Sequence, residues 1–100
     1  MLASAKIPKF SWSEGEVFNP ELWILNDSYE NIPAGTLIAY VDDVEIGRWD
    51  FSDVAENQNL QGPIVEYVLP KSDSNTMVLR LAVEGKEELG SEYILCKQRT

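Results

Sequence analysis

Apolar and polar residues alternate with a period of two along much of this chain, and this pattern restricts its possible folds more than any other feature. Residues 76–84 are the clearest case, because every second position there is apolar. The apolar residues are Met77, Leu79, Leu81 and Val83. Such alternation is typical of a β-strand with one face in a core and the other in solvent. No segment predicts more than a single turn of helix, so the expected class is all-β.

Turn-forming residues interrupt the alternation at short intervals and divide the chain into about seven expected strands. These are residues 6–12, 16–26, 36–41, 44–53, 64–69, 76–84 and 91–98, with a polar loop at 55–63. Pro8 marks the first as an edge strand, because proline cannot donate to a ladder. Asp42 and Asp43 can take the positive φ angles of a tight hairpin. This spacing predicts an antiparallel two-sheet β-sandwich of the immunoglobulin type, with a small barrel as the alternative.

Length and composition favour one packed domain over residues 1–100 and exclude several partners. Hydrophobic residues make up 44% of the chain, which is enough for a core without disulfides or a metal. The 17 Asp and Glu residues outnumber the 8 Lys and Arg residues and give a formal charge of −9. This charge repels phosphate backbones and anionic lipids, so neither nucleic acid nor a membrane is an expected partner. The chain also has no run of about 18 apolar residues that could span a membrane.

The residues needed for several kinds of active site are missing. The chain has no histidine, which excludes a Ser-His-Asp site, a Cys-His site and a histidine-bound metal. A glycosidase needs two carboxyl groups about 5 to 10 Å apart across a cleft. A sandwich of this size offers little material for such a cleft, so we expect no catalytic residue and no cofactor. Cys96 is the one cysteine, and it is expected to pack as a small apolar residue.

Asp42, Asp43 and Glu45 are the candidate metal ligands of the chain. Calcium takes clustered carboxylates and carbonyls, and these three carboxylates fall in one turn. Their spacing is not that of an EF-hand loop, and solvated turn charges are the alternative interpretation.

The three tryptophans and one asparagine complete the candidate residues. Trp12 lies at the end of an expected strand beside a turn, so it is the candidate for an exposed sugar-stacking platform. Trp23 lies in the most apolar segment, and Trp49 alternates in phase with Phe51, so both are expected to pack inside. Asn26 is expected to cap the loop that follows it through its side chain.

Two expected strands carry apolar residues on both faces. Ile64 and Val68 lie opposite in phase to the inner residues of 64–69, and Val78 and Ala82 lie opposite to those of 76–84. A free-standing sandwich normally places polar residues at such outer positions. Ile64, Val68, Val78 and Ala82 are therefore a predicted docking surface for another domain or a second copy, provided that they group together.

Three segments resemble a known family of domains. They are NPELWILNDSYENIPAG at 19–35, IGRWDFSDVAENQNLQGPIVEYVLP at 46–70 and ELGSEYIL at 88–95. They resemble the immunoglobulin-like β-sandwich domains of bacterial glycoside hydrolase family 2 enzymes, which include β-galactosidases, β-mannosidases and exo-glucosaminidases. The family's apolar-aromatic-apolar-apolar-Asn-Asp strand, Leu-Pro strand end and Ser-x-Tyr strand match residues 22–27, 65–70 and 91–95.

The resemblance implies a non-catalytic accessory domain, excised from a larger multidomain glycosidase. In such enzymes the catalytic carboxylates belong to a separate TIM barrel, typically about 250 residues long, so no catalytic residue carries over to this chain. The implied partners are the catalytic and other domains of the parent enzyme, with a carbohydrate as the alternative partner and little or no sugar affinity expected of the domain itself. The parent is expected in the periplasm or outside the cell. The alternatives are a carbohydrate-binding module and a free-standing immunoglobulin-like interaction domain.

Overall fold

The computed structural model describes residues 2–8, 11–13, 15–71, 75–86 and 90–98, and these ranges contain strands but no helix. The strands are β1 (Leu2–Lys6), β2 (Ser11–Ser13), β3 (Val17–Phe18), β4 (Glu21–Leu25), β5 (Gly35–Val41), β6 (Val44–Phe51), β7 (Asn59–Ile64), β8 (Tyr67–Val68), β9 (Thr76–Val83) and β10 (Ser91–Gln98). Within the described ranges there is thus no helix long and apolar enough to cross a membrane.

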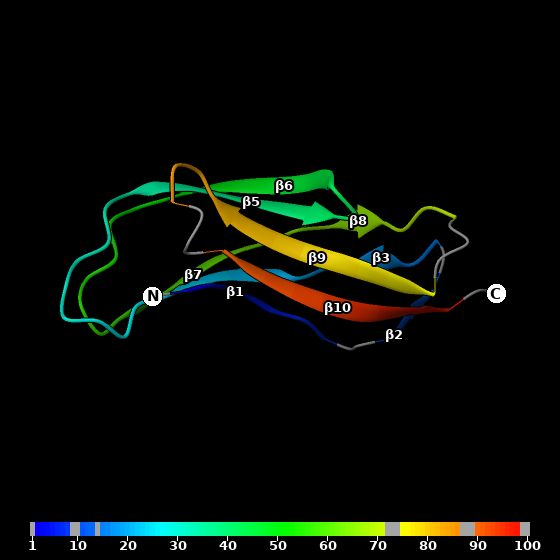
Figure 1. The fold of residues 1–100 in the computed structure, drawn as a ribbon, viewed down its shortest axis with the longest axis horizontal. Helices are drawn as coiled ribbons and strands as arrows, with labels where there is room; N and C mark the ends of the chain where they lie inside the picture. Colours follow the sequence, from blue (N-terminus) through cyan, green and yellow to red (C-terminus); the bar gives the residue numbers. More distant parts are fainter. Residues whose placement is uncertain (1, 9–10, 14, 72–74, 87–89, 99–100) are drawn as a thin grey trace.

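Two sheets form an elongated sandwich with axes of 47, 23 and 18 Å (Figure 1). One sheet has the strand order β2-β10-β9-β5-β6 and the other has the order β1-β4-β7, while β3 and β8 pair as a separate ribbon. The predicted all-β sandwich of the immunoglobulin type is therefore confirmed. The pairs among these strands are antiparallel except for β10 with β2, which is parallel and departs from the purely antiparallel prediction.

Two prolines divide segments that the sequence predicts as single strands. Pro8 lies inside the expected strand 6–12 and separates β1, which pairs with β4 in the three-stranded sheet, from β2, which pairs with β10 in the five-stranded sheet. Most of β1 precedes the expected strand, which reached back only to Lys6. Pro20 separates β3 from β4 in the same way. Proline has a fixed φ and no backbone N–H, so a continuous ladder ends there and the chain can change sheets.

The core lies between the inner faces of the two sheets, and β9 supplies one side of it with the predicted phase. The inner residues Met77, Leu79, Leu81 and Val83 are all at most 2% exposed. Leu22 and Ile24 of β4 are fully buried on the facing side. Full burial of a side chain of this size contributes about 1.5–3 kcal/mol, so this interior layer is the main source of stability.

The hairpin between β5 and β6 has the predicted geometry. Asp42 and Asp43 have φ angles of 48° and 68°, which is the left-handed conformation that a tight two-residue turn requires. Asp42 also joins the hairpin to β9, because its N–H donates to the Val78 carbonyl and its Oδ1 accepts from the Val78 N–H, both over 3.0 Å.

β7 is a strand where the sequence predicts a polar loop. Leu60 packs against the core, while the residues around it are mostly polar, glycine or proline. The segment therefore shows no clear apolar alternation. Gly62 lies against β6, where an added Cβ would meet Trp49 at 2.6 Å and the Leu22 carbonyl oxygen at 2.8 Å. β7 therefore forms through its ladder with β4 and its close approach to Trp49, and not through strand propensity.

Asn26, just after β4, is 1% exposed and joins two loops. Its Oδ1 accepts hydrogen bonds from the N–H and the hydroxyl of Ser28, over 3.1 and 2.7 Å. Its Nδ2 donates to the carbonyls of Glu30 and Ala55, over 2.9 and 3.0 Å. The predicted capping role of Asn26 is confirmed, and the side chain also holds the segment that leads to β7.

Candidate interaction surfaces

Trp12 is a core residue, so the prediction that it forms an exposed sugar platform is wrong. It is 3% exposed, and its ring meets the Phe18 ring edge-on, with centroids 4.9 Å apart and planes at 89°. The physical reason is the alternation within β2, where the side chains of Ser11 and Ser13 are only half-buried and Trp12 turns inward. The carbohydrate-binding alternative thereby loses its candidate residue.

Trp23 is half-buried on the outer face of the three-stranded sheet, so the prediction that it fills the core is also wrong. Its indole Nε1 donates to Glu21 Oε1 over 2.7 Å, and Gln61 Nε2 donates to the other oxygen of that carboxylate over 3.2 Å. Four consecutive apolar residues, at 22–25, hide the strand phase. The neighbours Leu22 and Ile24 take the inner positions.

The three candidate calcium ligands have separate partners. Asp42 bonds the backbone of β9, and Asp43 Oδ1 lies 3.7 Å from Arg80 Nη2. Glu45 Oε1 accepts a hydrogen bond of 2.7 Å from Arg48 Nη2, and this bond lowers the pKa of the Glu45 carboxyl. In the part of the chain that the structure describes, no group of three or more His, Cys, Asp or Glu residues is placed to hold a metal ion. The hairpin carboxylates therefore do not form the expected ligand set.

Ile64 and Val68 have the exposed positions that the sequence predicts. They are 57% and 60% exposed, while the alternate residues Val65 and Leu69 are buried. Val17 of β3 is the Cα partner of Val68 and is itself 46% exposed. We refer to Val17 and Val68 as the β3–β8 patch; Ile64, at the end of β7, lies four residues before Val68. Val17 was not among the predicted docking residues, because its neighbour Val68 is fifty-one positions away in sequence.

Val78 and Ala82 lie on the outer face of the five-stranded sheet, away from the β3–β8 patch. The predicted docking surface is therefore divided between two places. Val78 is half-buried opposite Ile94, which is 71% exposed. Cys96 follows on the same face and is exposed, contrary to the expectation that it packs inside. The strand phase predicts the outward direction of Val78 and Ala82, but phase alone does not say which sheet a strand joins.

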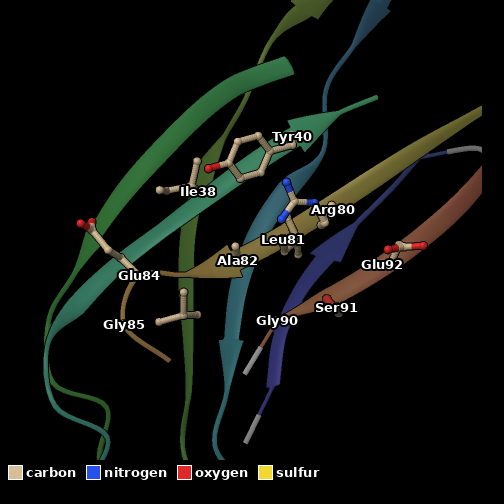
Figure 2. A pocket seen from close by; sticks show the side chains of 11 residues that line it. Ile38, Tyr40, Arg80, Leu81, Ala82, Glu84, Gly85, Gly90, Ser91 and Glu92 are labelled. Carbon is tan, nitrogen blue, oxygen red and sulfur yellow. The ribbon is translucent and has the colours of Figure 1, made fainter. Parts of the chain in front are cut away.

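A groove of about 760 Å³ hollows this outer face over β5, β9 and β10 (Figure 2). Ile38 and Ala82 are Cα partners at its centre. Ser91 pairs with Leu81, which brings the preceding Gly90 to the level of Ala82. Ala82 and Gly90 have little or no side chain, so this row of the sheet surface is low and the groove forms over it.

The groove has a charged row along one side and a carboxylate toward its far end. Tyr40, Arg80 and Glu92 are neighbours across three strands. The Arg80 guanidinium carbon lies 4.3 Å from the centre of the Tyr40 ring, which is a cation–π contact. Figure 2 shows Arg80 between the Tyr40 ring and Glu92, with Glu84 just past the end of β9. Arg80 is thus held by its neighbours, and the two glutamates remain as carboxylates of the lining.

The comparisons with solved structures concern the fold. The CARDB domain of the PF1109 protein from Pyrococcus furiosus, crystallised in complex with di-metal ions, superposes with a TM-score of 0.75. Alignment covers 96% of this chain and 90% of that one, at 8% sequence identity. The fold is similar to that of CARDB domains. A solution structure of the same archaeal domain gives a TM-score of 0.67, with 8% identity over 96% of this chain and 92% of the other.

Comparisons at the sequence level found no family model and no curated protein that matches the chain. A structural likeness at 8% identity establishes the β-sandwich fold and no site. The fold expected from the family 2 resemblance is therefore supported, while the glycoside hydrolase parent receives no support from these comparisons.

Proposed function

We propose that this chain is a non-catalytic β-sandwich domain that packs against another domain of a longer protein. The β3–β8 patch carries the proposal, because Val17 and Val68 are paired neighbours that are 46% and 60% exposed, and Ile64, which is 57% exposed, precedes Val68 by four residues. Removing such side chains from water stabilises a contact by about 25 cal/mol per Å² of apolar surface. Grouped exposed apolar residues mark interaction sites more often than scattered ones do. Contacts between domains of one chain bury about 600–1,500 Å², so the patch is the centre of a larger contact.

The chemistry of the domain agrees with a non-catalytic role. The absence of histidine removes the commonest general base. The carboxylates of the β5–β6 hairpin are separately bonded: Asp42 to the backbone of β9, and Asp43 and Glu45 to arginine side chains.

The segments at 19–35, 46–70 and 88–95 support a finer assignment through their resemblance to family 2 glycoside hydrolase domains. On this assignment, the domain that covers the β3–β8 patch is the catalytic TIM barrel of a glycosidase. The longer protein then degrades a carbohydrate in the periplasm or outside the cell.

The reading frame that encodes this chain tests both levels of the proposal. We expect it to continue into at least one further domain and, for the finer assignment, into a barrel of about 250 residues. A frame that encodes further domains without a barrel would overturn the glycosidase assignment alone. A frame restricted to this chain would overturn the packing proposal and favour a free-standing interaction domain.

A further inference from the structure

We propose that the groove on the outer face of the five-stranded sheet binds an extended, basic segment of a partner protein. This site shares no residue with the β3–β8 patch, and it goes beyond the packing role proposed above. The shape of the groove, the charges of its lining and the spacing of those charges each contribute to the inference.

The shape fits one extended chain. The groove follows β9 from Arg80 and reaches Glu84, just past the end of the strand, and four steps of extended chain at about 3.3 Å each give it a length of about 13 Å. Its centre is apolar, because Ile38 and Ala82 lie between the two charged ends. A short aliphatic side chain of the bound segment can lie over the low row at Ala82.

The charges favour a cationic occupant. The charged residues of the lining are Arg80, Glu84 and Glu92. The Arg80 charge is stacked on Tyr40 and lies 3.7 Å from the Asp43 carboxylate, whereas both glutamates are exposed. The net charge of −9 adds an attractive field for a basic partner and a repulsive one for an acidic partner.

Arg48, the cross-strand partner of Ile38, is a second cation on this face, and it is already engaged. The hydrogen bond to Glu45 and, to a smaller degree, the field of Glu84 raise the pKa of Arg48. Its guanidinium is hydrogen-bonded to Glu45 over 2.7 Å, so its interaction with Glu84 is the weaker of the two, and the Glu84 side chain is exposed.

The spacing of the two glutamates specifies the occupant further. Glu92 lies beside Arg80 on the neighbouring strand, so the two glutamates are about 13 Å apart along the strands and about 4.8 Å apart across them. In an extended segment, side chains two residues apart share a face, and residues i and i+4 are about 13 Å apart. The groove therefore fits a segment with Lys or Arg at i and i+4 and a small aliphatic residue at i+2. Among the eight Lys and Arg residues of this chain, no two are four positions apart. The chain thus lacks the matching segment, and its charge opposes binding of a second copy.

The probe is a nine-residue peptide of threonines, blocked at both ends, with Lys at its third and seventh positions and Val at its fifth. Isothermal titration calorimetry at low salt should give saturable binding to the intact chain. The double variant Glu84→Gln/Glu92→Gln should bind about tenfold more weakly, or not detectably. Ala82→Leu should also abolish binding, because the added side chain fills the low row. Circular dichroism checks that both variants remain folded.

The control double variant is Glu56→Gln/Glu66→Gln, which makes the same change in net charge at exposed positions outside the groove. This control variant should bind the peptide with unchanged affinity. A peptide with its two lysines adjacent should bind about tenfold more weakly to the intact chain.

Equal losses of affinity in the two double variants would mean non-specific attraction and would overturn the proposal. Absence of saturable binding would overturn the proposal too. Sedimentation experiments that show self-association of the chain, and its loss in Ala82→Leu, would also overturn it, because the occupant of the groove would then be a second copy. None of these outcomes affects the contact proposed at the β3–β8 patch.

Discussion

Replacing Trp12 by alanine is expected to lower the free energy of unfolding by about 3–5 kcal/mol. The side chain is 3% exposed, and its ring meets Phe18 edge-on at a centroid distance of 4.9 Å. The substitution removes the largest residue of the core and leaves a cavity beside Phe18. A domain of this size has a total stability of about 5–15 kcal/mol, so the variant should be close to unfolding. Urea denaturation followed by far-ultraviolet circular dichroism measures the loss.

Trp23→Ala is the matched control for this measurement. Trp23 is half-buried on the outer face of the three-stranded sheet, and its Nε1 bonds to Glu21. Its loss should cost about 1–2 kcal/mol, which is the range of a partly buried side chain with one hydrogen bond. A larger effect for Trp23→Ala than for Trp12→Ala would show that the inner and outer faces of β2 and β4 are assigned wrongly.

Removal of the Asn26 side chain is expected to cost about 2–4 kcal/mol, because each buried polar group that loses its partner costs about 1–3 kcal/mol. Asn26→Ala leaves the Ser28 N–H and the carbonyls of Glu30 and Ala55 without the bonds described above. Asn26→Asp keeps the shape of the side chain but replaces its donor by a second acceptor, so it should cost at least as much at neutral pH. Chemical denaturation measures both variants.

The control for Asn26 is Asn75→Ala. Asn75 is exposed, and its substitution should change the free energy of unfolding by less than about 0.5 kcal/mol. If Asn26→Ala has an equally small effect, the two loops that Asn26 joins are held by other interactions.

The sequence predicts the parts of the fold that depend on local patterning. The alternation at 76–84 and the Asp42–Asp43 turn are recovered as β9 and the β5–β6 hairpin, because both depend on residues that are close in sequence. β7 was missed because its stability comes from pairing with β4 and from the approach of Trp49 to Gly62. These are long-range contacts, and its own composition is that of a loop.

The two tryptophan errors have different origins. Trp12 lies between two serines, and this polar–apolar–polar triplet was a local signal for an inward side chain. Trp23 lies in an apolar run without a phase, so its outward direction follows only from the register of β4 with its neighbours. A single-residue change of register would reverse the two faces.

The two candidate surfaces likewise depend partly on local sequence and partly on long-range pairing of strands. The outward direction of Ile64 and Val68 could be predicted from the alternation within residues 64–69, although these residues belong to two strands, β7 and β8. The contribution of Val17 and the groove over Ala82 and Gly90 depend on which strands become neighbours. That information lies in the long-range pairing of the sheets and not in any local segment.

The most direct test of the packing proposal is the accessibility of position 68 in the longer protein. In a Cys96→Ser background, the variant Val68→Cys places a thiol at a site that is 60% exposed in this domain. Its alkylation rate, read by mass spectrometry of the peptide containing residue 68, is compared between the isolated domain and the longer protein. Tyr29→Cys, at a site that is 86% exposed, is the control in the same background.

We expect alkylation at position 68 to be at least about tenfold slower in the longer protein, because a packed interface excludes the reagent. The alkylation rate at position 29 should be the same in both forms. Equal rates at position 68 in the two forms would contradict the proposed contact.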